Sequence, residues 1–186
     1  ENGQLIKPAG SPAGTDSYSA AFGGGGTTDK DLPIDTQTGY VMPLYTNLFD
    51  GKIKEQAVAR LVDLLKENNY CLNTGFIGTP YLNIVLSENG YDDVAYKMFQ
   101  QTAYPSWIYP VLQGATTIWE RWNSYTLKNG FGPVDMNSFN HYSYGSIQDW
   151  MMAYSAGIQR DENNPGYKHF MLQPRIGGNF SFIHAS

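Results

Sequence analysis

The sequence has 186 residues, of which 12 are basic and 17 are acidic, so its formal net charge is −5. No cluster of Lys and Arg occurs along it, which argues against a nucleic-acid-binding protein, because such proteins present a concentrated positive surface. No apolar run approaches the roughly 20 residues that span a bilayer, so we expect a soluble chain without a membrane partner. The single cysteine, Cys71, excludes an intrachain disulfide and a cysteine-rich zinc site.

Aromatic residues make up 15% of the sequence and include 14 Tyr and 4 Trp. Residues of this kind at this density either fill a core or form a surface for flat apolar ligands. Core packing accounts for most of them. Sugars also present C–H faces that stack on Trp and Tyr, so the composition makes a carbohydrate site an early hypothesis.

Residues 1–34 are rich in Gly, Ser, Thr and Pro, and include the run Gly23 to Gly26. Such a composition buries too little apolar surface to offset the entropy of ordering the chain, so we expect a long loop or arm that lies on another part of the protein. The glycine run lacks the Lys-Ser/Thr of a phosphate-binding loop. The chain starts with Glu1 and has no signal peptide, so we expect a processed or excised N-terminus.

The helical part of the sequence begins at Asp35, a residue type that caps helices, and the first helix is expected to extend to residue 49. Asp50-Gly51 ends it, and the clearest helix of the chain follows over residues 52–69. Its apolar residues recur at helical spacing and predict a buried stripe. The stripe consists of Ile53, Ala57, Val58, Leu61, Val62 and Leu65.

The remaining helices follow in pairs joined by short turns. Pro80 suits the first position of a helix that ends at residue 88. The others are predicted over residues 92–101, over a short segment ending at residue 112 after the cap at 104–106, and over residues 138–157. Beyond Pro165 the pattern changes, and residues 167–173 and 179–184 are predicted strands.

About six helices joined in this way predict a mainly α fold of the α/α barrel or solenoid type. A ring of six helix pairs needs about twice as many helices, so we expect that roughly half a barrel is absent. The two predicted strands are too few to form a sheet that buries both faces. The expected organisation is therefore an arm over residues 1–34, part of a barrel over residues 35–164, and the start of a β domain over residues 165–186.

The most informative stretch for chemistry is residues 114–122, where Glu120 lies between Trp119 and Trp122 and beside Arg121. Aromatic walls disfavour the charged form of a carboxyl group, whereas a neighbouring cation favours it. The combination suits a partly desolvated carboxylate that acts as a general base. The same residues also fit a Glu120–Arg121 surface pair beside core tryptophans, which is the commoner arrangement.

His141 lies near the predicted start of the helix over residues 138–157. A helix N-terminus favours the neutral imidazole, which can exchange hydrogen bonds with a sugar hydroxyl. A structural histidine is the alternative. No second His lies within metal-ligand spacing, so we expect no metal site, and core or surface roles suffice for His169 and His184.

A series of segments in this sequence, taken together and in order, resembles the bacterial α-L-rhamnosidases of glycoside hydrolase family 78. The resemblance covers the chain from about Asp35 to its end. The segments are DTQTGY (35–40), TGFIGTPYL (74–82), LSENGY (86–91), QTAYPSW (101–107), GATTIWERW (114–122), NSFNHYSYG (137–145) and PGYKHF (165–170) with Pro174-Arg175.

The resemblance implies a partial (α/α)6 barrel followed by the first strands of a C-terminal β-sandwich. It also implies hydrolysis of terminal α-L-rhamnose with inversion at the anomeric carbon, without a cofactor. In that family the Glu of the Trp-Glu-Arg-Trp motif is the general base, which corresponds to Glu120. The His of the Asn-His-Tyr motif contacts the sugar, which corresponds to His141, and Trp119 and Trp122 are expected as subsite walls.

An inverting glycosidase needs two carboxyl groups about 6.5–9.5 Å apart. The family's general acid lies in an acidic stretch early in the barrel, and Asp16, Asp29 and Asp31 lack that context. We therefore expect the acid outside this chain. Asn123 departs from the family pattern, in which an acidic residue often follows the second Trp. The implied partners are a rhamnose-containing glycoside or polysaccharide and the rest of the same polypeptide, namely the N-terminal half of the barrel and the C-terminal β domain.

Three alternatives stay open on the sequence alone. A carbohydrate-binding fragment without catalysis would use the same Trp and Tyr residues and would keep its sugar affinity without Glu120. A related glycosidase could act on a different deoxy sugar or on a uronic acid. A helical-repeat scaffold would show an internal period of about 34 or 40 residues, which the sequence lacks.

Overall fold

The computed structural model describes residues 35–185, so the arm expected over residues 1–34 lies outside the described residues. The described part holds six helices, labelled α2 to α7, and four short strands in two antiparallel pairs, β1 with β2 and β3 with β4. The helices are α2 (Gln37–Tyr45), α3 (Gly51–Glu67), α4 (Thr79–Glu88), α5 (Asp92–Phe99), α6 (Ile108–Leu112) and α7 (Ile147–Trp150). The strands are β1 (Tyr125–Thr126), β2 (Gly130–Phe131), β3 (Ile158–Arg160) and β4 (Phe170–Leu172). The mainly helical fold class predicted from the sequence is confirmed.

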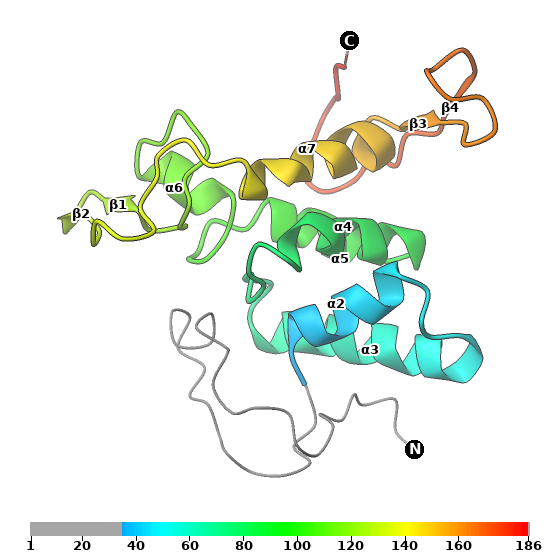
Figure 1. The fold of residues 1–186 in the computed structure, drawn as a ribbon, viewed down its shortest axis with the longest axis horizontal. Coiled ribbons are helices and arrows are strands. Elements are labelled where there is room, and N and C mark those ends of the chain that lie inside the picture. The colour runs from blue at the N-terminus through cyan, green and yellow to red at the C-terminus, as the bar shows by residue number, and fades with distance from the viewer. Residues whose placement is uncertain (1–34, 186) are drawn as a thin grey trace.

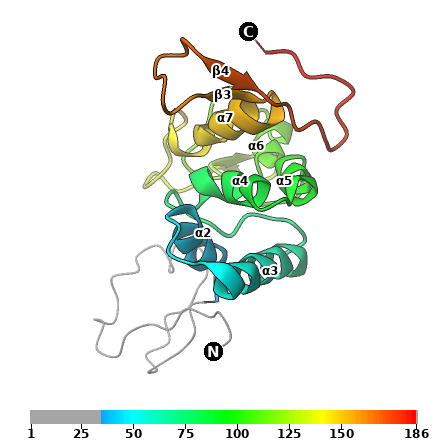
Figure 2. The same cartoon turned by 90° about the vertical axis from the view of Figure 1, so that its right-hand side faces the viewer.

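The helices lie in layers, with α2 and α3 at one end, α4 and α5 in the middle, and α6 and α7 at the other end (Figures 1 and 2). Helix α4 is the centre of this arrangement, since it packs against α2, α5 and α7. Its side chains are buried on most sides, including the polar Asn83 and Ser87. A helix that is buried nearly all round belongs in the interior of a larger helical assembly.

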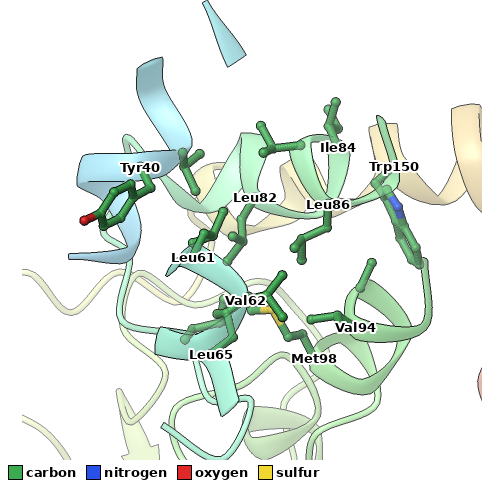
Figure 3. Packing of buried hydrophobic residues seen from close by; sticks show 14 of the residues in the cluster. Tyr40, Leu61, Val62, Leu65, Leu82, Ile84, Leu86, Val94, Met98 and Trp150 are labelled. Atoms are coloured by element: carbon green, nitrogen blue, oxygen red, sulfur yellow. The ribbon is translucent and has the colours of Figure 1, made fainter. Parts of the chain in front are cut away.

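The stripe predicted on α3 forms the floor of the core. Ala57, Leu61 and Leu65 are fully buried, and Val58 and Val62 are nearly so. Ile53, in the first turn, is 46% exposed and does not join them, because the helix extends beyond its neighbours there. Leu61, Val62 and Leu65 face Leu82 and Leu86 of α4 and Met98 of α5, and Trp150 closes the far side (Figure 3).

The start of the first helix differs from the prediction. Thr36, not Asp35, is the N-cap of α2, because its Oγ1 accepts a hydrogen bond from the N–H of Gly39 at 3.0 Å. Asp35 instead receives two hydrogen bonds from the Arg60 guanidinium of α3, at 2.6 and 3.0 Å. These bonds, with one from the Tyr40 hydroxyl, hold the pKa of Asp35 below its ordinary value. Asp35 therefore ties α2 to α3.

The last helix begins later than predicted. Residues 138–142 are not helical, and the helical segment consists of a 3₁₀ turn (Ser143–Ser146), α7, and a wider π turn (Met151–Ser155). The reason is that the main chain of Ser138 and His141 hydrogen-bonds to residues 118–120, and groups used in that way cannot also form helical bonds.

The C-terminal strands agree only in part with the prediction. Strand β4 lies within the predicted strand 167–173 and pairs with β3, which the sequence did not indicate. Gly157, at the entrance to β3, has a φ of +75°, and a Cβ there would lie 2.1 Å from the backbone N of Pro174, so only glycine fits. Residues 179–184, predicted as a strand, form no strand.

The tail after β4 instead crosses back over the helices. The Tyr96 hydroxyl of α5 donates to the carbonyl of Arg175 at 2.7 Å, and the Arg175 guanidinium lies 3.4 Å from the carboxylate of Asp92. The same guanidinium lies over the ring of Tyr154 at 5.2 Å. Further along, the N–H of Asn179 donates to Oε1 of Gln100, directly after α5, at 3.0 Å, so the start of segment 179–184 is bound to the end of α5 and not to another strand. Among the described helices, none is long and apolar enough to cross a membrane.

Candidate active site

The stretch that contains Glu120 and the stretch that contains His141 lie side by side. The N–H of Glu120 donates to the carbonyl of Ser138 at 2.9 Å, and the N–H of His141 donates to the carbonyl of Ile118 at 2.8 Å. The two segments therefore run antiparallel, with one more residue on the His141 side. The structure thus brings the segments 118–120 and 138–141 together, in the loop region near α6, β1 and β2 (Figure 1).

The Glu120 carboxylate is half-buried and anchored by one oxygen. Its Oε2 accepts a hydrogen bond from the N–H of Ser138 at 2.9 Å. Among residues 35–185, no group donates to Oε1. A carboxylate with one oxygen held and the other free has a defined orientation and can take a proton from a water molecule.

Arg121 hydrogen-bonds to the loop beside the site. It does not form an ion pair with Glu120 in the described part of the chain. Its Nη2 donates to the carbonyl of Pro133 at 3.1 Å and to Oδ1 of Asn137 at 3.3 Å. The guanidinium therefore supports the segment that leads to Ser138, and Ser138 holds the carboxylate. The surface-pair alternative left open by the sequence does not describe this arrangement.

The two tryptophans of the motif have different surroundings. Trp122 is 4% exposed and belongs to the core, where it stacks on Tyr144 with ring centroids 3.8 Å apart and meets the edge of Trp107 at 5.8 Å. Trp119 is 7% exposed and lies outside that core cluster, edge-on to Phe139 at 5.3 Å. For Trp122, the core role that the sequence left open is the one that the geometry shows.

Beside Trp119 lies a cavity of about 330 Å³. Aromatic residues and two threonines are among its lining residues, a mixture that suits a sugar-sized ligand. The lining residues are Gln113, Gly114, Ala115, Thr116, Thr117, Trp119, Tyr125, Phe131 and Phe139. Tyr125 and Phe131 face each other across the β1–β2 hairpin, whose two-residue strands are too short to show as alternation in the sequence.

The orientation of the His141 imidazole, and which of its nitrogens carries the proton when the ring is neutral, are set by its neighbours. Its Nδ1 accepts a hydrogen bond from the N–H of Ser143 at 3.3 Å, so the neutral ring carries its proton on Nε2. The ring is stacked on two others, Phe76 at 4.7 Å and 21° and Tyr142 at 5.2 Å and 11°. His141 therefore offers a held Nε2–H donor. It precedes the 3₁₀ turn rather than opening the long helix expected from the sequence.

Sequence reasoning missed several residues that build this site: Ser138, Phe76 and Tyr144. Tyr144 is 1% exposed, and its hydroxyl has no hydrogen-bond partner within residues 35–185. Burial raises the pKa of this phenol, with the nearby Tyr104 and Glu120 adding to the effect. All three lie in segments that carry the family resemblance, but only the folded chain shows which of them meet.

Within residues 35–185, no group of three or more His, Cys, Asp or Glu side chains could hold a metal ion. His169 lies at the surface, where its Nδ1 is 2.8 Å from the Asp161 carboxylate. Hydrogen bonds from Asn164, from the N–H of Asn163 and from His169 lower the pKa of Asp161 to about 2. These contacts order the turn between β3 and β4.

Comparison with known proteins relates the chain to one family. The family model described as the bacterial alpha-L-rhamnosidase 6 hairpin glycosidase domain matches residues 16–155. An alpha-L-rhamnosidase of Streptomyces avermitilis is 44% identical over 159 residues, which are 86% of this chain and 15% of that protein. One from Formosa agariphila is 46% identical over 145 residues, 78% of this chain and 15% of that protein.

Solved structures show the same relationship. The crystal structure of the Streptomyces avermitilis alpha-L-rhamnosidase complexed with L-rhamnose superimposes with a TM-score of 0.74 at 42% identity, over 88% of this chain and 15% of that one. The native enzyme from Aspergillus terreus gives 0.73 at 41% identity, over 78% of this chain and 17% of that one. The chain thus spans about 15% of the length of these relatives. It belongs to the bacterial alpha-L-rhamnosidase six-hairpin glycosidase domain family.

Proposed function

We propose that this chain is part of an inverting glycoside hydrolase that releases terminal α-L-rhamnose, with Glu120 as the general base. The observation that carries the proposal is the Glu120 carboxylate, held through Oε2 by the N–H of Ser138 and free at Oε1 among the described residues. The relatives named as alpha-L-rhamnosidases, one of them solved with L-rhamnose, supply the substrate class.

In this mechanism a water molecule lies between Glu120 Oε1 and the anomeric carbon of the bound sugar. As the water oxygen forms its bond to that carbon, Oε1 takes a water proton, and the bond to the leaving oxygen breaks on the opposite face. The general acid protonates the leaving oxygen. Attack from the face opposite the leaving group inverts the anomeric centre, so an α-L-rhamnoside gives β-L-rhamnose first.

The general acid is assigned to the polypeptide outside residues 1–186. One observation supports this assignment. The chain spans only about 15% of the length of its relatives, so other parts of such proteins are available to supply the acid. The rest of the same polypeptide is therefore the proposed partner, and residues 35–164 and 165–186 are proposed as the barrel part and the start of the β domain.

His141 and Trp119 are proposed to bind the sugar. The Nε2–H of His141 donates to a sugar hydroxyl, since Nδ1 is already occupied by the N–H of Ser143. Trp119 provides an aromatic wall on the side of the cavity. Trp122 stacks on Tyr144 in the core, and Tyr144 contacts Phe76, the ring that stacks on His141.

The test is Glu120→Gln in the full-length polypeptide that carries this domain, assayed on an aryl α-L-rhamnoside. The amide keeps the shape and the bond to Ser138 but cannot take a proton, so kcat falls by about 10²–10⁴-fold while the unfolding midpoint stays close to that of the parent. The matched control is Glu55→Gln, the same change at an exposed carboxylate of α3, which leaves kcat unchanged. Near-normal turnover of Glu120→Gln would remove Glu120 from the mechanism. Detection by NMR of the α-anomer as the first product would refute inversion.

A further inference from the structure

The loop from Asn73 to Thr79, which contains the segment TGFIGT, has no part in the proton transfer proposed above. It is nonetheless built tightly. The hydroxyls of Thr74 and Thr79 lie 2.7 Å apart and share a hydrogen bond across its base. The Thr79 hydroxyl also lies 3.1 Å from the carbonyl of Thr74 and 2.8 Å from that of Gly75. A loop closed in this way holds its apex residues in a fixed position.

Helix α2 clamps the same loop from outside. Gln37 is 3% exposed, and its Oε1 accepts a hydrogen bond from the N–H of Asn73 at 2.7 Å, while its Nε2 donates to the carbonyl of Cys71 at 3.1 Å. At the other end of the loop, a Cβ on Gly78 would lie 2.6 Å from Oγ1 of Thr38. The backbone therefore approaches α2 so closely that residue 78 has no room for a side chain.

The loop presents Phe76 to the imidazole of His141. The two rings are nearly parallel, with centroids 4.7 Å apart and an angle of 21°. Phe76 also contacts Tyr144 at 5.3 Å, and Tyr144 stacks on Trp122 in the core. The imidazole thus rests on a ring that is itself anchored to the core and to the clamped loop.

We propose that Phe76 is a positioning residue that acts through His141, and that the loop from Asn73 to Thr79 exists to hold it there. The inference rests on the proposed function, in which His141 Nε2–H donates to the sugar. The hydrogen bond from the N–H of Ser143 limits rotation of the imidazole about its own bond, and the Phe76 face limits its tilt. Removal of one constraint lets the donor leave the sugar hydroxyl, and small misplacements of this kind cost up to about 10²-fold.

The experiment compares Phe76→Leu and Phe76→Tyr in the full-length polypeptide on an aryl α-L-rhamnoside. The leucine keeps an apolar side chain but removes the flat ring, and KM rises about 10-fold, with a smaller fall in kcat. Inhibition by L-rhamnose weakens by the same factor. The tyrosine keeps the ring and restores KM to within about 2-fold of the parent. Ile77→Ala, on the same loop at a side chain that is 61% exposed, is the control and leaves KM unchanged.

A double-mutant cycle separates positioning from a merely structural role. If Phe76 acts through His141, Phe76→Leu causes no further rise of KM in a His141→Ala background. Equal losses in both backgrounds would overturn the inference. So would failure of the tyrosine to rescue. If Phe76→Leu does not stay folded at the assay temperature, Phe76→Met, with its flexible apolar side chain, is tested in the same cycle.

The outcomes also distinguish this inference from the proposed function. If His141→Ala by itself leaves KM and L-rhamnose inhibition unchanged, the proposed sugar contact of His141 is wrong, and the positioning role falls with it. If His141→Ala raises KM but Phe76→Leu does not, the sugar contact stands and only the positioning role is wrong.

Discussion

The helical layers and the loop region that carries the site are stabilised in different ways. In the layers, apolar side chains at helical spacing meet across helices, as Leu61 and Leu65 of α3 do with Leu82 and Leu86 of α4 (Figure 3). In the loop region, order comes from rings stacked in a row and from main-chain hydrogen bonds between segments 118–120 and 138–141. The first kind of order is periodic along the chain, and the second is not.

This difference shows where chemistry is possible in the molecule. A helix buried on most sides, such as α4, has no free surface for a ligand, but it gives the loops a rigid base. The loop segments can then bring together, from distant positions, the main chains that carry Glu120 and His141. The row of rings from Trp107 through Trp122 to Tyr144 joins the two regions, because Trp122 comes from the loop region and yet belongs to the core.

The largest effect is expected from Trp122→Ala, which tests whether Trp122 belongs to the core or to the site. If Trp122 is a core residue, its removal leaves a cavity beneath Tyr144 and lowers the free energy of unfolding by about 3–5 kcal/mol. Urea denaturation of the full-length variant and its parent measures the change. Trp122→Phe, which keeps one ring, is the control and loses less. A loss below about 1 kcal/mol would place Trp122 with the site rather than with the core.

A smaller effect is expected at the junction of α2 and α3 from Asp35→Asn. The Asp35–Arg60 pair is about one-third exposed on each side, so after solvent screening its loss costs about 1 kcal/mol at neutral pH. Because the folded-state pKa of Asp35 lies below its ordinary value of 3.8, the contribution is complete above that value and disappears as the pH falls through the folded-state pKa. Unfolding midpoints measured from pH 7 down to about pH 2 should therefore converge.

That convergence distinguishes a paired carboxylate from an ordinary surface group. A gap between Asp35→Asn and the parent that is constant across the pH range would contradict the ion pair as its cause.

The smallest effect is expected from Ile53→Gln. Periodicity assigns Ile53 to the buried stripe of α3, but the residue is 46% exposed, so a polar side chain changes the free energy of unfolding by less than about 0.5 kcal/mol. Leu61→Gln, at a fully buried position of the same helix, provides the contrast in the same urea titration. A large loss at Ile53 would mean that another part of the polypeptide covers this face.

Much of the helical layers could be predicted from the sequence, since amphipathic spacing and Pro80 act locally. The first helix, however, ends at Tyr45 rather than at residue 49, and Asp50 is the N-cap of α3 rather than the end of that helix. The predicted helix ends were wrong where a distant segment bound the same hydrogen-bonding groups. Asp35 was expected to cap α2, but it binds Arg60 of α3 and leaves the cap to Thr36. Residues 138–142 were expected to be helical, but their main chain bonds to residues 118–120. In both cases a contact between distant segments outweighed a local preference.

The sequence by itself determined the fold class and most of the stripe on α3, because residue type and short-range spacing carry that information. It named Glu120 and His141 as candidates through the motifs in which the chain resembles its family. Only the tertiary structure decided that Trp122 belongs to the core, that Ser138 anchors the Glu120 carboxylate and that Phe76 lies against His141. These contacts join residues many positions apart, and their geometry depends on how the loops rest on α2 and α4. Local periodicity cannot predict the distances between these residues, because the contacts form only when the helices have packed.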